Sequence, residues 1–124
     1  GDHRDLHLSI RRQRQMCIRD SYADALLKVG KPEQAKPVIR SGLRAAPDSL
    51  VLFQLLARAE GELGRLAESF QALAETHYLS GDLGLALEKL DLALQHSGSS
   101  SYLKASITAR ETELQREWDN QKTR

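Results

Sequence analysis

The chain has 124 residues, of which 40% are hydrophobic, 28% charged and only 5% aromatic. This length suits a single domain, and few β-branched residues beside many Ala, Leu, Glu and Arg argue against a β-sheet. The formal net charge of +1 gives no strong field to attract nucleic acid or a charged substrate. Cys17 is the single cysteine, which excludes an internal disulfide. No apolar run is long enough to span a bilayer, and no signal peptide is expected.

The N-terminal segment, residues 1–21, follows no regular hydrophobic period. Its stretch RRQRQMCIRDS resembles the peptide obtained by translating a common sequencing adapter in frame. We therefore expect residues 1–21 to be non-native or poorly ordered, although Arg and Gln favour helix and part of the segment could be helical. The alternative is an arginine-rich arm for nucleic acid. That arm would lack interleaved aromatic residues and would precede a nearly neutral domain.

The first two predicted helices form a hairpin. One covers about residues 22–29 and ends at Gly30. The next begins at Pro32, where a missing N–H costs nothing. Pro37 lies beyond this free first turn, so we expect a bend or an irregular start there.

Four further helices are predicted after the segment Pro47-Asp48-Ser49, which closes one helix and caps the next. They are expected at about residues 50–63, 66–79 and 83–96, and from Tyr102 onward. Residues after Asp119 are polar and are expected to fray.

The turns recur at a constant interval. Gly64 follows Gly30 by 34 residues, and Gly81 and Gly98 then follow at intervals of 17. A 34-residue period is that of the tetratricopeptide repeat (TPR), a helix–turn–helix unit. One such hairpin cannot bury its apolar face alone, so hairpins must stack. The sequence predicts an all-α, TPR-like α-solenoid of about six antiparallel helices, or three hairpins, over residues 22–119, with a frayed end at 120–124.

Three residues depart from the TPR pattern. Ser69 stands where the second helix of the middle repeat normally has a small alanine. The fourth helix is therefore predicted to serve as the second helix of one repeat and the first helix of the next. Glu60 and His77 occupy positions that are normally aromatic.

A more specific resemblance concerns residues 22–118. The segment ALAE at 72–75, the segment YLSGD at 78–82 and the later pattern over 101–114 are similar to the C-terminal TPR region of BepA-like proteins, the β-barrel assembly-enhancing proteases. The resemblance implies a periplasmic protein whose N-terminal part would be a zinc metallopeptidase. Its TPR part would engage the outer-membrane assembly machinery and client barrels.

The chain departs from that family in lacking an H-E-x-x-H motif. The four histidines (His3, His7, His77 and His96) include no i, i+4 pair with a neighbouring glutamate. We therefore expect no catalytic residue, cofactor or metal ligand in this chain, and zinc only in a separate catalytic domain.

Partner binding is predicted on the concave face, which in TPR arrays is lined by the first helix of each pair. Its charge is mixed and lacks the paired Lys and Asn of carboxylate-clamp TPRs, although Arg58 alone could anchor a carboxylate. The alternative is an ordinary solvated face. The residues predicted on the concave face are Asp24, Leu27, Gln54, Arg58, Gln71, Glu75 and Tyr78.

Leu85 and Leu92 form a second stripe, off the main face of the fifth helix. They are predicted either to pack on a neighbouring helix or to form an exposed patch for a partner or for a catalytic domain. Trp118 is expected to hold the last helix in place.

The predicted function is a protein–protein interaction module. On the resemblance, it would be the C-terminal part of a periplasmic zinc metalloprotease and chaperone that acts in outer-membrane protein assembly and quality control. Expected partners are the assembly machinery, client proteins and its own protease domain, with no nucleic acid and no membrane insertion. The alternative is a generic TPR scaffold or adaptor with unrelated partners.

Overall fold

The computed structural model describes residues 18–123, and these residues contain six helices and no strand. The first helix covers the described residues up to 28, so it includes the four residues before the predicted start at Tyr22. Residues 1–17, including Cys17, lie outside the described residues. The other helices are α2 (Pro32–Ala45), α3 (Leu50–Glu62), α4 (Leu66–Leu79), α5 (Leu83–Gln95) and α6 (Ser101–Lys122).

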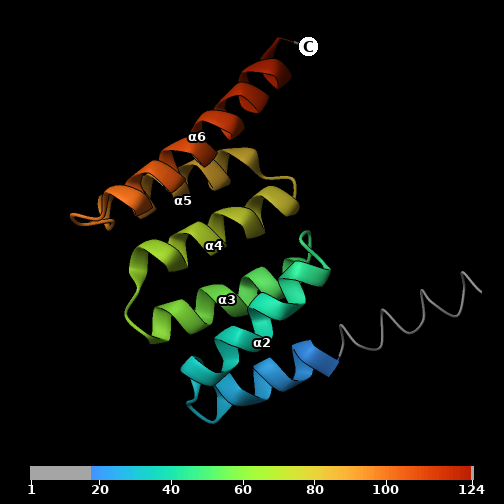
Figure 1. Ribbon diagram of the computed structural model, residues 1–124. Helices are drawn as coiled ribbons and strands as arrows, with labels where there is room; N and C mark the ends of the chain where they lie inside the picture. Colours follow the sequence, from blue (N-terminus) through green and yellow to red (C-terminus); the bar gives the residue numbers. More distant parts are fainter. Residues whose placement is uncertain (1–17, 124) are drawn as a thin grey trace, which may run out of the picture.

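The helices stack in chain order along one axis, with the helix of residues 18–28 at the bottom and α6 at the top (Figure 1). The extensive contacts from α2 onward join successive helices: α2 with α3, α3 with α4, α4 with α5, and α5 with α6. A closed bundle would instead bring helices distant in sequence around a shared centre. The fold is the predicted all-α, TPR-like solenoid.

The turns explain the regular spacing. Gly30, Gly64, Gly81 and Gly98 all have positive φ angles, which side chains rarely tolerate. After α3 the N–H of Arg65 donates to the carbonyl oxygen of Glu60 at 2.9 Å, and the N–H of Gly64 donates to that of Gly61 at 3.1 Å. This is the Schellman arrangement, which satisfies the last carbonyls of a helix.

Three helices begin with a side-chain cap. The oxygens of Ser49, Asp82 and Ser100 accept the N–H three residues later at 3.3, 3.0 and 3.2 Å. Each satisfies a helix-terminal donor that would otherwise lack a partner. The cap predicted in the segment Pro47-Asp48-Ser49 is confirmed at Ser49.

Proline and the C-terminus bring two differences. α2 begins at Pro32 and continues through Pro37, so the predicted irregular start is not found, and the alternative of a bend at Pro37 stays a prediction. Pro37 is exposed, where its ring meets solvent. At the other end, α6 continues to Lys122, beyond the predicted fraying point at Asp119.

Two apolar cores lie along the stack. The N-terminal core is formed by buried residues of the first three helices: Ala23, Leu26, Leu27, Ala35, Ile39, Leu52, Leu55 and Ala59. The C-terminal core is formed by buried residues of the last three: Ala74, Leu83, Ala86, Leu90, Ala93, Ile107 and Leu114. Trp118 packs against the C-terminal core, as expected for a residue that holds α6 in place.

Small residues join the two cores where α3 meets α4. Ala57, Ala67 and Ala72 are buried, and the hydroxyl of Ser69 donates to the carbonyl oxygen of Ala57 at 2.8 Å. The departure from the pattern at Ser69 therefore has a structural role, because its hydroxyl ties α4 to the backbone of α3.

Candidate partner-binding grooves

The structure does not bring the seven predicted binding residues together on one face. Three of them, Asp24, Gln54 and Arg58, line a hollow of about 890 Å³ between the helix of residues 18–28, α3 and α4. We call this hollow the first groove. Its remaining lining residues are Asp20, Ser21, Val51, Leu55, Ala57, Ser69, Leu73, Thr76 and His77.

Two others, Gln71 and Glu75, line a second groove of about 490 Å³, which also involves α2, α3, α5 and α6. The division follows from α4, because one side of this helix faces each groove. Ser69 and Leu73 lie in the first groove, and Gln71 and Glu75 in the second. A helix that serves two repeats contributes a different face to each, so one continuous concave face is not formed.

Leu27 is a clear correction. Its side chain is only 3% exposed and belongs to the N-terminal core. Ala23 and Leu26 on the same helix are also buried there. The predicted contact between Leu27 and a partner is therefore wrong, because this position faces α2 and α3.

Asp24 and Arg58 bind each other across the first groove. The Arg58 guanidinium lies 3.1 Å from the Asp24 carboxylate, and Lys28 Nζ lies 2.9 Å from its other oxygen. The hydrogen bond from Lys28, together with that from Arg58, lowers the pKa of Asp24. Among the described residues only Nη1 of Arg58 makes this contact, so its other N–H groups can still donate to a partner carboxylate.

We expect the pKa of Asp24 to rise toward its ordinary value in Lys28→Met, and to rise less in Arg58→Met, because Lys28 is the main cause of the lowering. Carbon-detected NMR titration of the Asp24 carboxyl measures both shifts. Folding lowers the pKa of Asp24, so the ionised Asp24 carboxylate stabilises the fold near neutral pH. This stabilisation is lost as the pH falls through the lowered pKa. An unchanged pKa in Lys28→Met would contradict the assignment.

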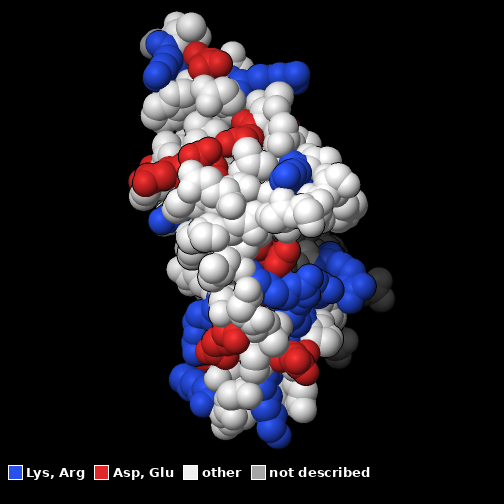
Figure 2. Space-filling model, turned by 90° about the vertical axis from the view of Figure 1, so that its left-hand side faces the viewer, with Lys and Arg blue, Asp and Glu red and all other residues white. Residues whose placement is uncertain are grey.

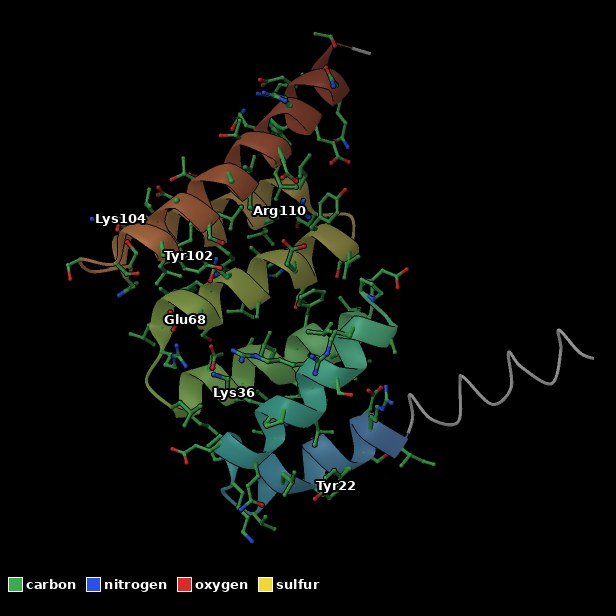
Figure 3. All side chains as sticks on the ribbon, in the orientation of Figure 1. Tyr22, Lys36, Glu68, Tyr102, Lys104 and Arg110 are labelled. Carbon is green, nitrogen blue, oxygen red and sulfur yellow. The ribbon has the colours of Figure 1, made fainter. Side chains whose placement is uncertain are left out.

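Side chains of α6 reach across the second groove and bind residues of α4. Nε and Nη2 of Arg110 donate to the two carboxylate oxygens of Glu75 at 2.6 and 2.9 Å. The same guanidinium lies 4.9 Å from the centre of the Tyr78 ring, and the Tyr78 hydroxyl donates to Glu117 at 3.0 Å. Paired, bidentate contacts of this kind fix geometry well. Glu75 and Tyr78 therefore hold α6 against α4 (Figure 3, where Arg110 is labelled).

The same contacts shift two pKa values. The carboxylate of Glu75, through its hydrogen bonds, raises the pKa of Arg110. The hydrogen bond to Glu117 raises the pKa of Tyr78, with burial as the next cause. Both groups keep their protons at neutral pH, so Arg110 still binds Glu75 and the Tyr78 hydroxyl still donates to Glu117.

Tyr78→Phe is expected to lower the free energy of unfolding by roughly 0.5–1.5 kcal/mol, because one hydrogen bond to a carboxylate is lost while the ring remains. Urea denaturation followed by circular dichroism measures the change. The matched control is Tyr102→Phe, since Tyr102 is 86% exposed and its change should have no effect. Equal losses in the two variants would mean that the hydroxyl of Tyr78 contributes nothing specific.

A buried ion pair lies beside the second groove. Lys36 Nζ of α2 lies 2.6 Å from Glu60 Oε1 of α3, and the two side chains are only 11% and 3% exposed. Two charges removed from water are stable only when they are paired closely. Glu60 therefore stands at an aromatic position of the pattern because Lys36 neutralises it. In the sequence, the only sign of this ion pair was that a charged residue, Glu60, stands at a position that is normally aromatic.

Residues 18–59 match the family model described as tetratricopeptide repeat. The match covers 42 of the 124 residues, namely the first helix, α2 and most of α3. It identifies the type of repeat and no particular parent protein. A comparison with curated proteins gave no match.

The TPR match contains Asp24, Gln54 and Arg58 of the first groove, and also most of a basic hollow that we did not predict. The latter measures about 680 Å³ and is lined by Glu33, Lys36, Pro37, Arg40, Arg44, Leu63 and Arg65. In Figure 2 most blue side chains lie over the lower half of the face shown, where the N-terminal helices are. Among residues 18–123, Arg40 and Arg44 form no ion pair, so their charges are open to solvent.

The predicted second surface, formed by Leu85 and Leu92 of α5, is only partly exposed. Leu85 is 36% exposed, whereas Leu92 is partly buried. Packing of both leucines on a neighbour is therefore not observed, and a patch centred on Leu85 stays a prediction.

Within residues 18–123 no group of three or more His, Cys, Asp or Glu is placed to hold a metal ion. None of the described helices has the length and apolar character needed to cross a membrane.

Proposed function

We propose that this chain is a protein-binding module whose first groove holds a segment of a partner protein. The observation that carries the proposal is an open hollow of about 890 Å³ between the first helix and α3, which lie largely within the TPR match, and α4, which follows it. Its apolar part includes Val51, which is 46% exposed, and the half-buried Leu73. Polar groups of Gln54, Arg58 and His77 surround these side chains. An apolar centre with a polar rim is the usual composition of a protein interface.

The second groove is the weaker candidate. Glu75 and Tyr78 are already bound to Arg110 and Glu117 of α6. A partner would have to break these contacts, which would cost part of its binding free energy. The first groove needs no such rearrangement.

Site-specific photo-crosslinking in the native host tests the proposal. A photoreactive residue at Gln54, which is exposed in the first groove, should capture a discrete partner. The same residue at Gln95, which is exposed on α5 and lines none of the hollows described above, is the matched control. Equal capture at both positions, or capture at Gln95 alone, would contradict binding in the first groove.

The resemblance to BepA-like proteins supports a finer proposal. On it, the chain is the C-terminal part of a periplasmic zinc metalloprotease and chaperone, and its partners are the outer-membrane assembly machinery, client proteins and its own protease domain. Zinc would then be held by that other domain. The match to the general TPR supports the alternative of a scaffold with unrelated partners.

Genomic sequence upstream of Tyr22 separates these alternatives. An H-E-x-x-H motif there supports the protease parent, whereas further repeats support the scaffold. Neither result changes the expectation for Gln54, so the groove and the parent protein are tested independently.

A further inference from the structure

The basic hollow lies outside the first groove, and the two share no lining residue. Four of its seven described lining residues are basic and one, Glu33, is acidic, so the hollow carries an excess of positive charge. Arg40 and Arg44 belong to α2, and Arg65 precedes α4 at the turn after α3. Two segments of the chain therefore contribute guanidinium groups to one hollow of about 680 Å³, a volume in the range of ligand sites.

Three of the four cations have N–H donors that are free for a ligand. Lys36 is not one of them, because its ammonium is buried in an ion pair. Nε of Arg65 lies 3.2 Å from the Glu68 carboxylate, and this is the one ion-pair contact of that guanidinium within residues 18–123, so both Nη groups can still donate. Arg40 and Arg44 are exposed and form no ion pair in the same part of the chain.

The two arginines of α2 are poorly explained by stability. Arg40 and Arg44 are four residues apart, which puts them on one face of the helix, where like charges repel each other. Arg44 lies in the last turn of α2, and the negative end of the helix dipole compensates its charge. Arg40 lies outside that turn and has no such compensation. An uncompensated guanidinium in the lining of a hollow indicates a ligand of opposite charge.

We propose that the basic hollow binds a short acidic segment of a partner protein through the carboxylates of Asp or Glu side chains. Guanidinium groups bind carboxylates through two parallel hydrogen bonds, which makes arginine well suited to this contact. The half-buried Leu63 and the Pro37 ring also line the hollow and can contact the aliphatic part of the segment. Because the first groove lies elsewhere, this inference does not depend on what that groove binds.

The spacing of the arginines indicates the form of the acidic segment. Arg40 and Arg44 are separated by about 6 Å along the axis of α2. In an extended chain, side chains two residues apart lie on the same side at a separation of about 7 Å. Acidic residues at alternate positions of an extended segment therefore match these two arginines, and Arg65 is available for a third carboxylate.

A nucleic acid fits the hollow less well. Single-stranded nucleic acid is held by a basic track together with aromatic side chains that stack on the bases. None of the seven described lining residues is aromatic, and Glu33 would repel phosphates that continued along α2. These features favour carboxylates over phosphates as the ligand.

The chain itself does not supply the acidic segment. Residues 1–17 contain four arginines and two aspartates, so this segment is basic. The acidic residues of α6 are interspersed with Arg110, Arg116 and Lys122, so a second copy presents no continuous acidic segment there. The occupant is therefore expected on a different protein.

Fluorescence anisotropy with the full chain tests the proposal. The probe is a fluorescein-labelled peptide in which glutamate alternates with serine, and the control peptide has glutamine in place of every glutamate. We expect the glutamate peptide to bind at least about tenfold more tightly, through two or three charged contacts. Its binding should weaken as sodium chloride is added. Failure of the glutamate peptide to bind, or equal binding of the two peptides, overturns the proposal.

Paired substitutions locate the binding site. Arg40→Gln with Arg44→Gln should weaken binding of the glutamate peptide about tenfold, because two ion pairs are lost. Lys104→Gln with Arg116→Gln removes the same charge from exposed positions of α6 and should weaken it by less than about twofold, since distant charges are screened. Equal weakening by the two pairs overturns the proposal. Residues 1–17 are the same in every chain, so their arginines cannot produce a difference between variants.

Two further results identify other occupants. If a fluorescein-labelled oligodeoxythymidine binds more tightly than the glutamate peptide, and Arg40→Gln with Arg44→Gln weakens it, the ligand is a nucleic acid. If sedimentation of the full chain shows a dimer that the same pair dissociates, the occupant is a second copy. Either result overturns an acidic segment of another protein. Photo-crosslinking at Gln54 reports on the first groove alone, so the two proposals fail separately.

Discussion

Leu90→Ala is expected to lower the free energy of unfolding by about 2–5 kcal/mol. Leu90 is 1% exposed and packs in the C-terminal core with Ile107 and Leu114. The substitution removes buried methyl groups and leaves a cavity. α5 packs between α4 and α6 and cannot easily move to close it. Urea denaturation followed by circular dichroism measures the loss.

Leu85→Ala is the matched control, because Leu85 lies on the same helix and is 36% exposed. We expect a loss of less than about 1 kcal/mol from it, since much of its surface already meets water. If Leu85→Ala costs as much as Leu90→Ala, the assignment of inner and outer faces to α5 is wrong.

Glu60→Leu is the second substitution expected to have a large effect, with a loss of about 3–5 kcal/mol. It leaves the ammonium of Lys36 without its partner at 2.6 Å, at a position where little water reaches it. The double variant Glu60→Leu with Lys36→Met should recover most of this loss, because no buried charge remains. Thermal and urea denaturation of the parent chain, the two single variants and the double variant measures the coupling between the two sites.

Arg65→Met with Glu68→Leu provides the control pair, since these charges lie 3.2 Å apart on a half-exposed surface. Its single variants should change stability by less than about 1 kcal/mol. Additive losses at Lys36 and Glu60, with no recovery in the double variant, would contradict a buried pair.

The fold was predictable because its determinants are local. Glycines with positive φ angles, the caps at Ser49 and Asp82 and the helical spacing of alanine and leucine all act within a few residues. They set helix lengths and turn positions, and the constant interval between turns sets the stacking. The predicted bounds of α4 coincide with the observed Leu66–Leu79 for this reason.

The binding face was less predictable because it depends on helix rotation. Leu27 was assigned by its position in the repeat, yet its helix turns this side chain toward α2 and α3. Ser69 did signal that α4 serves two repeats. What it did not reveal is that Gln71 and Glu75 would then face a different groove from Gln54 and Arg58.

Long-range polar pairs were not predictable from local pattern. Arg110 binds Glu75, which lies 35 positions earlier in the chain, and Lys36 binds Glu60 on the next helix. Each pair needs the stacked helices to be in place before its members meet. Glu60 was recognisable as unusual, but nothing in its neighbourhood identified Lys36 as the partner.

The central claim is that the helices form an open stack with two separate cores, and methyl NOE spectroscopy of the full chain tests it most directly. We predict NOEs of Leu27 and Leu52 with Ile39 in the N-terminal core, and of Leu90 with Ile107 and Leu114 in the C-terminal core. No NOE should join Leu27 to Ile107 or Leu114. Such cross-core NOEs would show helices gathered around one centre and would contradict the solenoid.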